Sequence, residues 1–102
     1  MDAIMTDEAK KMQQLKIREF IKENRPLFWY IKEESLESIS VEFLVETILH
    51  YGSEKSVKGL FDLVGIREVA EIFYKQISGN RVNYPPRTVH FFDLYFKKHA
   101  HA

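Results

Sequence analysis

The chain has no cysteine, and this absence removes several kinds of chemistry at once. Without thiols there can be no disulfide, no thiolate metal site and no thiol nucleophile. Small secreted domains commonly depend on disulfides, so the absence favours a cytoplasmic protein. At 102 residues the chain has room for one domain, and a core of that size folds without a covalent staple.

Long hydrophobic runs are also missing. The longest apolar stretches are only a few residues long, whereas about 20 residues are needed to cross a bilayer. The chain begins MDAIMTDE, which is acidic and mixed and lacks an apolar run after a basic stretch. We therefore expect no signal peptide, no membrane partner and a soluble, cytoplasmic protein.

Net charge is absent as well, because 15 Lys and Arg residues balance 15 Asp and Glu residues. A protein held to DNA mainly through phosphates is normally basic over at least one face. The charge is uneven along the chain, with an acidic excess in residues 25–52 and a basic excess in residues 78–102. Such drift is common on a solvated surface, and it can also mark a basic contact patch near the C-terminus.

Hydrophobic residues between positions 40 and 78 recur with the spacing of three amphipathic helices. Ser40 and Ser53 stand where an N-cap accepts a backbone hydrogen bond. Gly52 and Gly65 stand where helices end, and we expect Gly52 to adopt the left-handed conformation that glycine tolerates best. The three predicted buried faces are Val41, Leu44, Val45, Ile48 and Leu49, then Val57, Leu60, Phe61 and Val64, then Ile66, Val69, Ala70, Phe73 and Ile77.

Two more helices are expected towards the ends of the chain. Residues 7–23 have helical composition and are followed by Asn24-Arg25-Pro26, which stops a helix. Residues 86–98 begin with a proline suited to the first helical position. The apolar segment PLFWYI, residues 26–31, is compatible with a short helix or with an extended plug into the core.

These patterns predict an all-α protein, a compact bundle of four to five short helices with no sheet. We expect residues 1–25 to form an N-terminal helix that is either frayed or in contact with a partner. Residues 26–98 should form the helical domain, and residues 99–102 a tail.

No residues form a recognisable catalytic motif. The sequence has no glycine-rich phosphate loop, no HExxH and no serine in an elbow-like glycine context. Glu33, Glu34 and Glu37 lie on a polar connector, which is typical of a solvated face. His99 and His101 supply two metal ligands, fewer than the three or four of a dedicated site. We therefore expect no catalytic residue, no cofactor, no metal and no enzymatic activity.

Short helices around Gly52 and Gly65 also allow a helix-turn-helix interpretation. Such a motif places a buried apolar side chain six residues after the turn glycine. Lys58 and Glu71 occupy those two places, and a buried charge fits poorly there. A small DNA-binding transcriptional regulator with a degenerate helix-turn-helix is therefore kept as the alternative function.

Aromatic residues are abundant, with eight Phe, five Tyr and one Trp. Most fall on predicted core positions. We expect Trp29 to be a core anchor with its indole N–H bonded; in the alternative, Trp29 is exposed and serves as the hot spot of a partner interface. The remaining aromatic residues and the basic C-terminal region are the candidates for partner binding. The candidate residues are Phe28, Trp29, Tyr30, Arg81, Arg87, His90, Lys97 and Lys98.

Several short motifs resemble a family of small bacterial helical proteins often encoded beside AbiEii-like nucleotidyltransferase toxins. The chain shows Leu27-Phe28-Trp29, a helix ending Tyr51-Gly52, Leu60-Phe61 with Gly65, and a closing segment from Pro86 to Phe96. Family members tend to show a Phe-Trp pair, a Tyr-Gly helix end and a closing Pro-Lys-Thr-x-x-Phe-Trp segment. The resemblance covers about residues 26–98.

The chain departs from the family at Phe92, where Trp is usual, at Pro85, where Ser is usual, and at Tyr30, where Asp or Asn is usual. The resemblance implies an antitoxin-like protein that binds a nucleotidyltransferase-type toxin, and it assigns no catalytic residue. We therefore expect a cytoplasmic protein-interaction module that binds and restrains a partner protein. Nucleic acid is the less favoured partner.

Overall fold

The computed structural model describes residues 7–100, and all regular structure among them is helical. Five α-helices and two 3₁₀-helices are present, and no strand occurs within these residues, so the all-α prediction is confirmed. The chain divides into two units, residues 1–38 and residues 39–102. Within residues 7–100, no helix is both long enough and apolar enough to cross a membrane.

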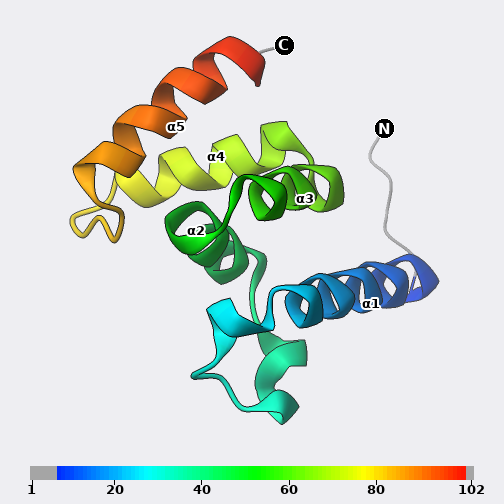
Figure 1. Cartoon of the computed structure of the whole chain (residues 1–102). Coiled ribbons are helices and arrows are strands. Elements are labelled where there is room, and N and C mark those ends of the chain that lie inside the picture. Colours follow the sequence, from blue (N-terminus) through cyan, green and yellow to red (C-terminus); the bar gives the residue numbers. More distant parts are fainter. Residues whose placement is uncertain (1–6, 101–102) are drawn as a thin grey trace. The chain divides into compact units, whose positions relative to one another are not determined.

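The first unit consists of one long helix followed by two 3₁₀-helices that both contact it (Figure 1). The Asn24 backbone N–H and side-chain amide donate to carbonyls in the last turn of the long helix, which ends there, just before Pro26. The Arg25 guanidinium donates to the carbonyls of Phe28 and Ile31 and so holds the following turn. The elements are α1 (Asp7–Glu23), η1 (Arg25–Phe28) and η2 (Glu33–Ser38).

The position of η1 and η2 changes the predicted division of the chain. Because both contact α1, they belong to the first unit, which ends after residue 38 and not after residue 25. Of the two conformations that were open for residues 26–31, the short helix is the one observed, since η1 covers Arg25–Phe28.

The second unit contains the four remaining helices. Ser40 and Ser53 are N-caps, as the sequence predicts. Their hydroxyls accept hydrogen bonds from the backbone N–H groups of Phe43 and Ser56, respectively, each at 3.1 Å. Gly65 alone separates two of these helices and has a φ of 99°. The elements are α2 (Val41–Tyr51), α3 (Glu54–Val64), α4 (Ile66–Ile77) and α5 (Pro86–His99).

Three of these helices contact one another, and α5 lies along α4 (Figure 1). Their predicted apolar faces supply the core of the unit. Phe73 is at its centre and contacts the rings of Tyr84, Phe92 and Phe96 at centroid distances of 5.4, 6.1 and 5.4 Å. The side chains of the unit with no exposed surface are Leu44, Val45, Ile48, Leu60, Val69 and Phe73.

The conformation of Gly52 differs from the prediction. Its φ and ψ are −75° and 159°, which is extended backbone and not left-handed. The helix end still requires glycine, but for lack of space: a Cβ atom there would lie 2.6 Å from the carbonyl oxygen of Ile48. Glycine is therefore needed at position 52 because the backbone of Ile48 approaches closely, and not because φ is positive.

Candidate functional site

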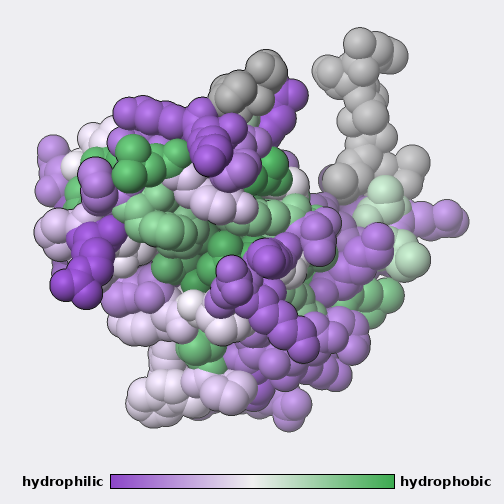
Figure 2. Space-filling model, turned by 45° about the horizontal axis from the view of Figure 1, so that its top comes forward, coloured by the Kyte–Doolittle hydropathy of each residue, from purple (hydrophilic) through white to green (hydrophobic). Residues whose placement is uncertain are grey.

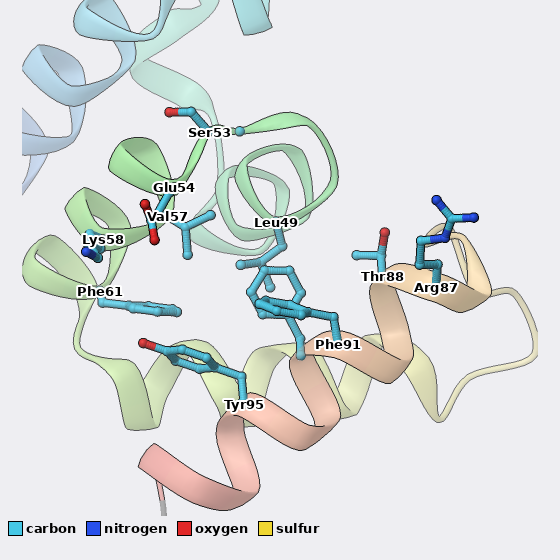
Figure 3. Close-up of a pocket in the computed structure, with 12 residues that line it drawn as sticks. Leu49, Ser53, Glu54, Val57, Lys58, Phe61, Arg87, Thr88, Phe91 and Tyr95 are labelled. Atoms are coloured by element: carbon cyan, nitrogen blue, oxygen red, sulfur yellow. The ribbon is translucent and has the colours of Figure 1, made fainter.

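A groove in the second unit runs between α3 and α5 and has a volume of about 470 Å³ (Figure 3). It is mostly apolar, with a few polar side chains among the residues that line it. Figure 2 shows hydrophobic side chains gathered on one face of the unit and bordered by hydrophilic ones. The lining residues are Leu49, Gly52, Ser53, Glu54, Val57, Lys58, Phe61, Arg87, Thr88, Phe91, Phe92 and Tyr95.

The α3 wall is formed by residues from two successive helical turns. Glu54, Val57, Lys58 and Phe61 follow the spacing i, i+3, i+4 and i+7, which places them on one side of the helix. The Ser53 cap fixes where this helix begins and therefore which side faces the groove. The two apolar residues of this set, Val57 and Phe61, point into the groove (Figure 3).

The α5 wall repeats the same spacing. Thr88, Phe91, Phe92 and Tyr95 follow i, i+3, i+4 and i+7 along the helix. Phe92 is buried and anchors the helix to the core, whereas Phe91 keeps 57 % of its surface exposed. Large apolar side chains therefore remain open to solvent along this wall.

Ring contacts hold the two walls together at one end. Phe61 stacks on Tyr95 with ring centroids 5.7 Å apart, and it meets Phe96 edge-on at 5.9 Å. Tyr95 in turn stacks on Phe91 at 6.1 Å. Leu49, from the end of α2, points toward the Phe91 ring (Figure 3). These contacts give the groove fixed apolar sides in the absence of a partner.

Charged groups lie only at the edges of the groove. Arg87 extends away from the rings at one end, and Glu54 and Lys58 lie on the α3 side (Figure 3). Glu54 and Lys58 are four residues apart with the acid first, the favourable order on a helix. Among residues 39–100 of the second unit, no carboxylate lies within ion-pair distance of Arg87.

Behind the groove, a polar contact joins α4 to α5. The Tyr74 hydroxyl donates to Asp93 Oδ1 at 2.7 Å, and Lys97 Nζ lies 3.2 Å from Asp93 Oδ2. Burial, together with the hydrogen bond to Asp93 and its charge, raises the pKa of Tyr74 to about 12. The Tyr74 hydrogen bond, followed by the Lys97 contacts, lowers the pKa of Asp93 below its usual value. This pair fixes which side of α5 faces the groove.

The three aromatic residues predicted to bind a partner at positions 28–30 divide into two groups. Phe28 has no exposed surface, so it is a core residue and cannot contact a partner. Trp29 is 77 % exposed, so the prediction that it is a core anchor is wrong. Tyr30 is 54 % exposed, and its ring meets Trp29 edge-on. This pair belongs to the first unit and does not line the groove.

The predicted basic residues are all exposed, but they do not converge on one site. Arg87 lines the groove. Arg81 lies in the loop before α5, and His90 lies on α5 outside the groove lining. Lys97 is engaged with Asp93, and Lys98 follows it in the last turn. The structure therefore brings one of the five basic candidates to the groove.

Most of the residues that line the groove were not predicted from the sequence to form a site. Leu49, Val57, Phe61, Phe91 and Tyr95 were assigned to buried faces or treated as surplus aromatics, and none was named as a site residue. A signal was present in α5, where an apolar or aromatic residue occurs at nearly every position from 89 to 96. A helix can bury only one side against a single neighbour, so some of these residues had to stay exposed.

Metal-ligating residues do not gather in the described part of the chain. Among the side chains that the structure describes, no three of His, Asp or Glu come close enough to hold a metal ion. His99 stacks obliquely on Tyr95 at 4.5 Å, and His101 lies outside the described residues.

No family model, curated protein or solved structure matches this chain. The resemblance to the toxin-associated bacterial family therefore stays a prediction.

Proposed function

We propose that this protein is a cytoplasmic helical interaction module that binds and restrains a partner protein through the α3–α5 groove. The observation that carries the proposal is the row of aromatic residues along the groove, with Phe91 more than half exposed. Exposed apolar surface of this kind, bordered by polar residues, is characteristic of protein interaction sites.

The residues of the groove are of the type that contributes most to binding. Aromatic side chains bury a large area on association and lose few rotamers, since each has two side-chain torsions. Tyr95 already contacts both Phe61 and Phe91, so little ordering remains when a partner binds. A preformed aromatic surface therefore favours specific binding.

The kind of partner follows from the resemblance in the sequence and is part of the proposal. A nucleotidyltransferase-type toxin would be held inactive while this protein occupies it. In this mechanism the chain performs no reaction, and restraint depends on the lifetime of the complex. Loss of groove contacts would then release the partner mainly through faster dissociation.

A comparison of two variants in the native host tests the proposal. Phe91→Lys places a charge in the groove, whereas Leu94→Lys makes the same change on the same helix outside it. Leu94 is a matched control because it is 55 % exposed, nearly the same as Phe91. Tagged proteins are recovered from nuclease-treated extracts, and the co-purified proteins are identified by mass spectrometry.

We expect one defined protein to accompany the wild type and Leu94→Lys and to be lost with Phe91→Lys. Equal recovery with all three forms would refute binding at the groove. Recovery of nucleic acid alone from untreated extracts would favour DNA binding instead. The exposed face of α4 gives that alternative little support, because Arg67 and Lys75 are offset there by Glu68 and Glu71.

A further inference from the structure

We infer that the segment bound in the α3–α5 groove is an amphipathic α-helix of about two turns, with a carboxylate placed to meet Arg87. This inference rests on the proposed function and specifies the chemistry of the partner. Its apolar side chains would recur at i, i+3 or i+4, and i+7, and they would lie against Phe61, Phe91 and Tyr95.

The length of the groove supports a helical occupant. Each wall contains four residues with the spacing i, i+3, i+4 and i+7, from Glu54 to Phe61 on α3 and from Thr88 to Tyr95 on α5. Seven residues of helix extend about 10 Å, or two turns. A third helix laid between two helical walls of this length presents three side chains at the same repeat, as in other grooves that bind helices.

The distribution of polar groups supports the same occupant. A small-molecule site usually holds a few polar groups that converge on the ligand. Here the Arg87 and Ser53 polar atoms point away from the cavity, and the rings of Phe61, Phe91 and Tyr95 face its interior (Figure 3). The Ser53 hydroxyl already accepts the Ser56 backbone N–H as a helix cap. An extended peptide would also need backbone partners, and the groove walls are helices whose backbone groups bond internally.

The charge at the rim determines the polarity of the partner. Glu54 and Lys58 have opposite charges at helical i, i+4 spacing and largely offset each other. Arg87 has no acidic partner among residues 39–100 of its own unit and lies at one end of the groove. A carboxylate at the end of the bound helix would form a bidentate pair with its guanidinium.

Synthetic helical peptides of about 16 residues test this inference on the full chain, cross-linked on their solvent face because free helices of that length are marginal. The first peptide carries leucines at i, i+4 and i+7 with Glu at both ends. The second has the same composition with the leucines moved off that face. The third replaces the terminal Glu residues by Lys, and the fourth contains a central proline. Binding is measured by fluorescence anisotropy at low salt.

We expect the first peptide to bind at least about tenfold more tightly than the other three, a difference of 1.4 kcal/mol or more. Phe91→Lys should remove this binding, and Leu94→Lys should preserve it. Arg87→Glu should reverse the preference between the Glu and Lys peptides. Lys55→Glu makes the same charge change at an exposed residue of α3 outside the groove, so it should leave the preference unchanged.

Three results would overturn the inference. The proline peptide could bind as well as the first, the Glu and Lys peptides could bind equally to the wild type and to Arg87→Glu, or no peptide could bind. None of these results bears on whether a host protein is captured in a Phe91-dependent way. Failure of the helical occupant and failure of the proposed function are thus distinguished by the two experiments.

Discussion

Gly52 lies where α2 passes into α3, and the space around it has no room for a methyl group. An added Cβ would be 2.6 Å from the Ile48 carbonyl oxygen and 3.1 Å from the Ser56 Cβ. Both neighbours belong to helices and cannot move far. Gly79 offers a contrast, because nothing lies within 4 Å of the corresponding position there and its φ is not positive.

We predict that Gly52→Ala lowers the free energy of unfolding by about 1–3 kcal/mol, the usual cost of overpacking a filled site. Gly79→Ala is the control and should change it by less than about 1 kcal/mol, in the stabilising direction. Urea denaturation followed by circular dichroism measures both. Equal effects of the two substitutions would show that Gly52 is not constrained by its neighbours.

Trp29 shows how a neighbouring residue can mislead a prediction from sequence. It follows Phe28 and precedes Tyr30 in an apolar segment, which favoured burial. The segment forms a 3₁₀-helix and turn, where successive side chains point about 120° apart. Phe28 takes the single inward direction, so Trp29 and Tyr30 are left outside.

Because Trp29 is the only tryptophan, its fluorescence reports this arrangement directly. At 77 % exposure, its emission should be red-shifted and readily quenched by acrylamide. Trp29→Ala should change the free energy of unfolding by no more than about 0.5 kcal/mol, as for surface substitutions. Blue-shifted emission resistant to quenching would place the ring in the core and contradict the structure.

The helices themselves were predictable because their boundaries depend on neighbouring residues. Asp7–Glu23 has the predicted bounds, and α5 ends at His99, one residue beyond the prediction. Serine caps, glycine stops and Pro86 act within one turn of the chain, so the sequence displays them directly. The groove was not predictable in this way. It depends on how α5 packs along α4, which leaves one side of α5 open toward α3. This packing joins residues far apart in the sequence, so no local sequence pattern indicates it.

The contact between α4 and α5 gives the unit a pH dependence. The raised pKa of Tyr74, about 12 against an ordinary value of 10.0, means that its contribution to stability is present below pH 10. That contribution is lost as the pH rises through the folded pKa. The lowered pKa of Asp93 acts in the opposite sense, so its contribution is present at neutral pH and is lost as the pH falls through the folded value.

We predict that Tyr74→Phe weakens the alkaline loss of stability and brings the pKa of Asp93 back toward its ordinary value. Some alkaline loss should remain, because burial and the charge of Glu46 also raise the pKa of Tyr84. Denaturation midpoints between neutral pH and pH 12 measure the first effect. NMR titration of the Asp93 carboxyl measures the second. An unchanged Asp93 titration in Tyr74→Phe would contradict the hydrogen bond.

At the scale of the whole molecule, the exposed aromatic residues are divided between the two units, and the basic C-terminal residues do not converge on one site. Phe91 lines the groove of the second unit, and Trp29 and Tyr30 form an exposed pair in the first. Of the basic residues in the C-terminal region, only Arg87 reaches the groove. Binding should therefore depend on apolar contact, with charge selecting the partner through one residue and not through a general basic patch.

Site-specific photo-crosslinking in living cells tests the central claim, that a partner protein docks in the α3–α5 groove. p-Benzoyl-phenylalanine is placed at Phe91 in one strain and at Leu94 in another, and irradiated adducts are identified by mass spectrometry. We predict a single protein adduct from position 91 and little from position 94. Adducts from position 94, with none from position 91, would contradict the account.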